Sequence, residues 1–292
     1  MSLLTRIDPS WLGLSHDHEQ SLSADDRARS CWAFPIIGML VGAITALVWY
    51  VAHLLHMPTV ICAALAVLAG VLVTGGLHED GLADAADGLF GPIQRTVEQR
   101  LAIMRDPHLG SFAVVTLFFS LSLRVASLSS QNLISGAVML IIAHIVSRGL
   151  MARFLTQPLA RLDGIASYFI ASHNSTKFFA EQLAELRPKL FATDPKTALY
   201  NSVTSLNFCV TMAGLIADIA ILILWYFDFV SVLQIFALYV ILIILLGGFG
   251  FLARFRLGGM TGDIYGAAQQ IAECIIMVFL TVPLSLWTDW TW

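Results

Sequence analysis

Residues 75–91 read GGLHEDGLADAADGLFG and follow directly on a long apolar run. In a helix, Asp80, Asp84 and Asp87 would recur at i, i+4 and i+7 and share one face, because successive residues turn by about 100°. Three like charges on one face repel each other, so the pattern indicates a bound cation. A solvated acidic turn between two membrane helices would explain the charge but not this register.

The acidic face predicts a site for a hard divalent cation. Mg²⁺ prefers oxygen ligands and is typically held by one or two carboxylates together with substrate phosphates. The glycines and alanines between the aspartates leave room for a ligand or a neighbouring helix to approach the backbone. We therefore expect Asp80, Asp84 and Asp87 to be metal ligands and members of a catalytic site.

The composition is that of a membrane protein. Of the 292 residues, 58% are hydrophobic and only 12% are charged, whereas soluble domains carry about 25% charged residues. The sequence predicts an all-α, polytopic integral membrane protein that forms one domain over residues 1–292. The net charge of -4 is too small to suggest a nucleic-acid partner. The cysteines are dispersed, which favours buried free thiols over disulfides or a zinc site.

Long apolar runs predict about seven membrane spans. Gly38 and Gly42 in the first run have the small-xxx-small spacing typical of close helix packing. A polar leader at 1–30 precedes the spans, and a long polar connection at 156–201 separates the fourth from the fifth. The expected spans are 32–54, 59–74, 111–129, 133–154, 202–225, 230–252 and 267–286.

Positive charge is distributed asymmetrically. Apart from Arg124 and Arg148, every Lys and Arg lies in the leader, in connections on one side of the predicted spans or, for Arg153, at the end of the fourth span on that side. The positive-inside rule then puts the N-terminus in the cytoplasm, and residues 75–91, 104–112 and 258–267 on the cytoplasmic face. We expect a bacterial cytoplasmic (inner) membrane protein whose active site faces the cytoplasm.

Arg124 and Arg148 lie inside the third and fourth predicted spans. An intramembrane arginine is costly and usually faces a partner or a polar cavity. We expect a structural pairing for Arg124, which is the deeper of the two. For Arg148, a substrate-facing role and a structural ion pair remain equally open.

Two further features complement the acidic face. Arg100, Arg105 and Arg148 offer guanidinium groups, whose planar fork suits phosphate oxygens. The segment GGMTGDIYGA at 258–267 opens the last predicted span, and a glycine-rich helix start favours anions. Asp263 in that segment is a fourth candidate metal ligand. Together the features predict a metal-bridged diphosphate and transfer of a phosphoryl-linked group from a nucleotide diphosphate donor to an alcohol.

The motifs resemble those of the cobalamin-5'-phosphate synthase family. Residues 75–91 are followed by IMRDPHLGSF (103–112), SRG (147–149) and GGMTGDIYGA, and their order and spacing fit from about residue 34 to residue 273. The resemblance implies an integral inner-membrane enzyme that uses Mg²⁺. It would join adenosylcobinamide-GDP to α-ribazole or its 5'-phosphate and release GMP, late in vitamin B12 synthesis.

The resemblance also implies roles for individual residues. Asp80, Asp84 and Asp87 are the best metal-ligand candidates, and Glu79 ranks below them. Arg105 and Asp106 of the RD motif join the three aspartates as catalytic candidates. Glu273 follows the TGD motif. The candidate substrate-binding residues are Arg100, His108, Arg148, Gly259, Thr261 and Gly262. The expected partners are the two substrates and the lipid bilayer, and a homo-oligomer stays open.

Two other classes of protein share part of this pattern. A CDP-alcohol phosphotransferase would also use an aspartate cluster on a membrane helix, but its DGxxAR pattern breaks at Asp84. A transporter would place carboxylates at mid-span and show repeats between its halves. Here the carboxylates lie at predicted span ends and no such repeat is seen.

Overall fold

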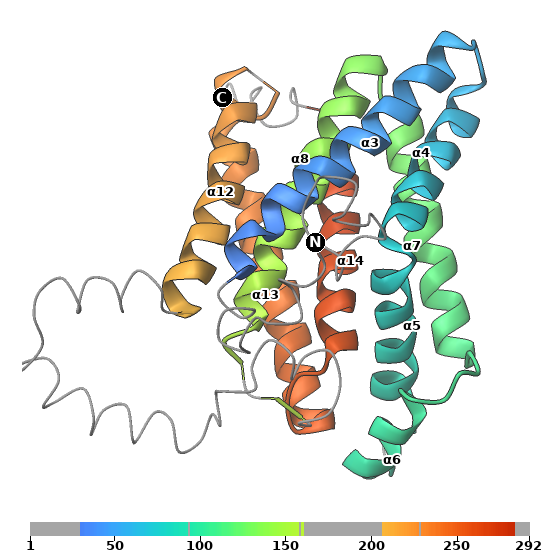
Figure 1. Cartoon of the computed structure of the whole chain (residues 1–292), viewed down its shortest axis with the longest axis vertical. Coiled ribbons are helices and arrows are strands. Elements are labelled where there is room, and N and C mark those ends of the chain that lie inside the picture. Colours follow the sequence, from blue (N-terminus) through green and yellow to red (C-terminus); the bar gives the residue numbers. More distant parts are fainter. Residues whose placement is uncertain (1–29, 93, 158, 161–205, 228, 284–292) are drawn as a thin grey trace, which may run out of the picture.

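The computed structural model describes residues 30–92, 94–157, 159–160, 206–227 and 229–283 (Figure 1). Within those ranges the regular structure is helical, and the expected all-α class is confirmed. The polar leader and most of the 156–201 connection lie outside the described residues. The elements are η2 (Ser30–Ala33), α3 (Phe34–Leu54), α4 (Thr59–Thr74), α5 (Leu77–Phe90), α6 (Val97–Ile103), α7 (Ser111–Ser129), α8 (Leu133–Phe154), α12 (Leu206–Tyr226), α13 (Val232–Leu257) and α14 (Gly262–Phe279).

The described helices form a multi-pass membrane protein. Five of them are long and apolar enough to cross a membrane, or six if α4 and α5 count as one bent span. The five are Ser30–Leu54, α7, α8, Phe208–Tyr226 of α12, and α13. Within the described residues, length and apolarity therefore give five or six spans, whereas the sequence predicts about seven over the whole chain. With 16 residues, α4 is shorter than the roughly 20 needed to span, and α14 contains Asp263, Gln269, Gln270 and Glu273.

Helix α8 lies at the centre of the bundle, packed against α3, α12 and α14. Figure 1 shows α3 crossing α8. The crossing is close because α3 presents glycines there: a Cβ at Gly38 would lie 2.2 Å from the His144 carbonyl oxygen, and one at Gly42 would lie 2.7 Å from Ile141 Cα. The small-xxx-small pattern predicted from sequence therefore marks a real contact between backbones.

A sharp corner separates α4 from α5. The two helices meet at 89°, and the linking residues Gly75 and Gly76 have φ of 69° and 71°. Glycine suits this left-handed backbone because it has no Cβ. After the corner, α5 packs against α7 and α14.

The polar connections gather at one end of the bundle, the lower end in Figure 1. There Leu159 pairs with Met260 in an isolated bridge, and the Ala160 N–H donates to the Met260 carbonyl at 2.8 Å. Arg256 Nη1 donates to the Leu89 carbonyl oxygen at 3.4 Å. The ends of α5, α8 and α13 therefore lie together, as the charge pattern predicted.

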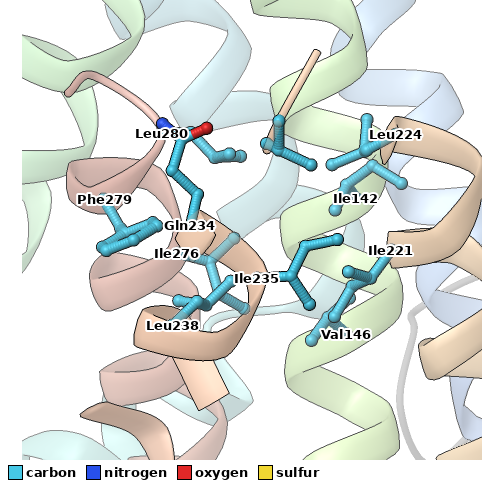
Figure 2. A pocket seen from close by; sticks show the side chains of 11 residues that line it. Ile142, Val146, Ile221, Leu224, Gln234, Ile235, Leu238, Ile276, Phe279 and Leu280 are labelled. Atoms are coloured by element: carbon cyan, nitrogen blue, oxygen red, sulfur yellow. The ribbon is translucent and has the colours of Figure 1, made fainter. Parts of the chain in front are cut away.

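A small apolar cavity lies among α8, α12, α13 and α14. Figure 2 shows its lining side chains, which are apolar apart from Gln234. The Gln234 amide is already bonded, because its Oε1 accepts from the Ser231 N–H at 2.9 Å and its Nε2 donates to the Val282 carbonyl at 3.4 Å. This cavity offers hydrocarbon packing and no reactive group.

Candidate active site

The helix predicted for the acidic stretch is α5, and its carboxylates point in two directions. Asp80 is exposed and Asp84 and Asp87 are half-buried, whereas Glu79 is buried. Neighbouring residues on a helix are separated by about 100°, so Glu79 and Asp80 cannot share a face. The face carrying the three aspartates is the one open to a ligand, and Glu79 turns into the bundle.

The start of α14 lies directly against α5. A Cβ at Gly81 would lie 2.9 Å from the Asp263 carbonyl oxygen, and one at Gly266 would lie 3.3 Å from His78 Cα. Gly81 sits between Asp80 and Asp84 in the sequence. The contact therefore brings the TGD segment beside the turn of α5 that carries these two aspartates.

Thr261 begins α14 as its N-cap. Its side-chain oxygen accepts from the Ile264 N–H at 3.3 Å, and its hydroxyl donates to Asp263 Oδ2 at 3.1 Å. The preceding Gly259 faces the end of the α8 connection, where a Cβ would lie 2.5 Å from Ala160 N. This segment is held by its neighbours, and Gly262 opens the helix. Binding of substrate by Gly259, Thr261 and Gly262 stays a prediction.

Asp87 has a backbone partner at the start of α7. Its Oδ2 accepts from the Gly110 N–H at 2.6 Å and its Oδ1 accepts from the Ala113 N–H at 3.1 Å. A carboxylate at this position satisfies donors that the first helical turn leaves unpaired. The structure thus gives Asp87 a role in joining α5 to α7, and its role as a metal ligand stays a prediction.

The RDPHLG segment between α6 and α7 is exposed. Asp106 Oδ1 lies 3.0 Å from the donating His108 N–H and 2.6 Å from His108 Nδ1. The hydrogen bond from the His108 backbone, followed by that from its side chain, lowers the pKa of Asp106 below its ordinary value. Asp106 is therefore an anion at neutral pH, and Arg105 and His108 lie in the same solvent-facing turn.

Arg100 is buried, whereas a residue that binds substrate phosphate would need an open surface. It is only 2% exposed, and its guanidinium donates to the carbonyls of Gly88 at 2.8 Å, Leu89 at 3.3 Å and Pro92 at 2.7 Å. A cation here satisfies the C-terminal carbonyls of α5 and opposes the negative end of the helix dipole. Substrate binding by Arg100 stays a prediction.

Arg124 lies at the centre of a buried ion network. Its Nη2 donates to Glu79 Oε1 on α5, and its Nη1 donates to Glu273 Oε1 on α14, both at 3.0 Å. Gln270 Nε2 also donates to Glu79 Oε1, at 3.0 Å. The expected structural pairing of Arg124 is confirmed. One side chain on α7 therefore links the two helices that carry the acidic motif and the TGD motif.

Arg148 joins the same network from α8. Its Nη1 lies 2.9 Å from His144 Nδ1 and 3.9 Å from Glu273 Oε2, and His144 Nδ1 is itself 3.0 Å from Glu273 Oε2. Gln269 Nε2 donates to Glu273 Oε2 at 2.7 Å. Of the two roles left open for Arg148, the structure contains the ion pair, and a contact with substrate stays a prediction.

Sequence reasoning missed His144, Gln269 and Gln270, and it ranked Glu79 too low to notice its pairing. A signal was present, since His144 and Arg148 are four residues apart and share a face of α8. Polar side chains at this spacing inside an apolar run indicate an internal polar cluster.

The donor set can be compared with what a hard cation needs. Among the residues that the structure describes, no three His, Cys, Asp or Glu side chains gather closely enough to hold a metal ion. Asp80, Asp84 and Asp263 nevertheless offer only oxygen donors, on two helices whose backbones touch at Gly81. That chemistry fits Mg²⁺ bound jointly with substrate phosphates and does not fit a thiophilic metal.

Comparison with known protein sequences identifies the family of this chain. The sequence profile described as Cobalamin-5-phosphate synthase matches residues 1–281. The chain belongs to the cobalamin-5-phosphate synthase family. Known members of this family are similar to it along nearly their whole length, as their identities and coverage show.

Three relatives named adenosylcobinamide-GDP ribazoletransferase show the extent of the similarity. The protein of Shewanella frigidimarina is 34% identical, with 98% of this chain and 94% of the relative covered. That of Azorhizobium caulinodans is 35% identical, with 89% and 86% covered. That of Bradyrhizobium diazoefficiens is 33% identical, with 86% and 82% covered. No solved structure matches the chain.

Proposed function

We propose that this chain is an adenosylcobinamide-GDP ribazoletransferase. It transfers the phosphoryl-cobinamide moiety of adenosylcobinamide-GDP to α-ribazole or α-ribazole 5'-phosphate. The products are adenosylcobalamin or its 5'-phosphate and GMP, in the last steps of vitamin B12 biosynthesis. The observation that carries this proposal is the family match over residues 1–281, with relatives of that name similar over nearly the whole chain.

The geometry supports a phosphoryl-group transfer. A hydroxyl of the ribazole attacks the phosphorus next to the cobinamide, a new P–O bond forms, and the P–O bond to GMP breaks. The hydroxyl proton passes to a carboxylate on the ligand-facing side of α5. Asp80 and Asp84 are the first candidates for this base, and both oxygens of Asp87 accept backbone hydrogen bonds from α7.

Mg²⁺ is part of the proposal. Asp80, Asp84 and Asp263 would hold it where α5 meets α14, with Asp87 beside them. The ion would neutralise charge that develops on the diphosphate oxygens as GMP leaves. The backbone N–H groups that open α14 favour a phosphate on the same side. Arg105 and His108, in the exposed turn before α7, would meet the nucleotide from solvent.

We further propose that this site faces the cytoplasm across a bacterial inner membrane. The support is the gathering of Arg95, Arg105, Arg254 and Arg256 at the end of the bundle where α5, α8 and α13 finish. Positively charged connections are retained on the cytoplasmic side. A GDP-linked substrate would then reach the aspartates of α5 from the aqueous side.

The decisive experiment is GMP release by the purified protein in lipid nanodiscs. The expected result is GMP formation that requires adenosylcobinamide-GDP, α-ribazole and Mg²⁺ together. The control replaces the corrinoid donor with a CDP-activated lipid alcohol. The absence of GMP from a folded sample would overturn the proposal. Release of CMP from the lipid donor would overturn it and favour a CDP-alcohol phosphotransferase.

A further inference from the structure

A lateral groove with a cavity volume of about 210 Å³ runs between α8 and α13, and Met260 also lines it. Most of its lining is hydrocarbon, including Leu150, Leu242 and Leu246. Ile243, which lines the groove, is 67% exposed, and other large apolar side chains on the same helix are also exposed. In a membrane-spanning bundle, such a surface faces lipid. The groove therefore opens sideways into the bilayer rather than toward the aqueous site on α5.

An arginine also lines this groove. Arg153 lies in the last turn of α8 and is exposed. Within the described part of the chain its guanidinium has no hydrogen bond or ion pair. Its Nη2 is 3.0 Å from where a Cβ at Gly214 would stand, so the side chain lies across α12. A cation on an apolar, lipid-facing surface is costly unless an anion meets it.

A second arginine lines the same groove. Arg254, in the last turn of α13, donates one hydrogen bond to Gln157 Oε1, which leaves most of its five N–H donors available. Among the described residues, the nearby carboxylate is that of Asp218, which accepts from the Tyr239 hydroxyl. Two arginines and one aspartate leave a net charge of about +1 on the groove, which one phosphodiester would balance.

The shape of the groove suits a hydrocarbon chain. Tyr239 and Arg254 both line it and are fifteen residues apart on one helix, a rise of about 22 Å. Between them, Gly247 lines the groove, and a Cβ there would meet nothing within 4 Å. The absence of a side chain at this position keeps open a track comparable in length to an acyl chain.

We infer that the groove between α8 and α13 binds one glycerophospholipid with a net negative headgroup. Its phosphate contacts Arg153 and Arg254, and one acyl chain runs along α13 past Gly247. Met260, the residue before the N-cap of α14, also lines the groove. The bound lipid therefore supports the connection that leads into the TGD segment.

The experiment measures lipids retained by the full chain after purification from mixed micelles containing equimolar phosphatidylglycerol and phosphatidylcholine. Native mass spectrometry should show one phosphatidylglycerol per chain, retained about fivefold over phosphatidylcholine. Arg153→Gln should abolish this preference. Arg95→Gln removes the same charge at the same end of the bundle, away from the groove, and should leave the preference unchanged.

A second pair of variants tests the acyl track without changing charge. Gly247→Leu should fill the groove and lower phosphatidylglycerol retention. Gly248→Leu is the matched control, because a Cβ there also meets nothing within 4 Å but the residue does not line the groove. Equal retention of the two lipids, unchanged retention in both groove variants, or displacement of the lipid by adenosylcobinamide-GDP or α-ribazole would each overturn the inference.

Discussion

Gly81 of α5 touches the backbone of Asp263 at the start of α14, where a Cβ would come within 2.9 Å of the Asp263 carbonyl oxygen. This contact joins the two segments that the sequence marks as acidic and anion-favouring. This distance leaves no room for a side chain at position 81. The two helices can therefore approach this closely only because residue 81 is a glycine.

Gly81→Ala should therefore impair catalysis more than folding. The added methyl group forces the two helices apart, and displacements of this size in a catalytic site lower turnover by about 100-fold. Overpacking of this kind destabilises by about 1–3 kcal/mol. GMP release and thermal unfolding in detergent measure the two effects. Gly248→Ala is the control, and wild-type activity in Gly81→Ala would contradict the close contact.

Asp84→Asn should abolish GMP release while leaving the protein folded. The substitution removes a charged oxygen from the proposed Mg²⁺ site but keeps the shape and polarity of the side chain. Turnover is measured across a Mg²⁺ titration, and helical content by circular dichroism. Glu98→Gln, at an exposed position on α6, is the control. Full activity in Asp84→Asn at low Mg²⁺ would exclude a metal-binding role for this residue.

Asp87 permits a test that separates capping from catalysis. Asp87→Ala loses the acceptor for Gly110 and Ala113 and should destabilise the fold by about 1–2 kcal/mol. Asp87→Asn keeps an acceptor oxygen, so its stability should stay near that of the wild type. If Asp87 is also a metal ligand, Asp87→Asn will be folded yet inactive. An active Asp87→Asn variant would leave Asp87 with the capping role alone.

Glu273→Gln should destabilise the protein strongly, by about 3–5 kcal/mol, because it leaves the arginines of the buried network with too little negative charge. The measurement is the midpoint of thermal unfolding in detergent. Glu98→Gln, at an exposed position on α6, is the control and should have almost no effect. An unfolding midpoint unchanged in Glu273→Gln would show that the network contributes little to holding α7 and α14 together.

Much of the fold could be predicted because apolar runs report directly on membrane helices. The expected spans at 59–74, 111–129 and 133–154 coincide with α4, α7 and α8. The predicted start of the last span, at residue 267, lies five residues after the start of α14, because Thr261 caps this helix before its apolar residues begin. Hydropathy alone could not anticipate that a helix would begin within a glycine-rich polar segment.

The candidate site was predicted less completely. The register of α5 identified a face with three aspartates, but the sequence could not show that Glu79 faces Arg124, because that pairing links residues far apart in the chain. Arg100 was interpreted from its charge alone, and the carbonyls it contacts belong to the end of a helix whose position depends on tertiary packing. Local pattern indicates which face is polar, whereas long-range contacts decide which polar group each side chain meets.

The corner at Gly75 and Gly76 has a mechanical consequence. A continuous span that tilts to match a thicker or thinner bilayer carries all of its side chains with it. Because α4 ends in two left-handed glycines and α5 is fastened instead to α7 and α14, tilting of α4 need not be transmitted to the aspartates. The carboxylate spacing is thereby insulated from variations in membrane thickness.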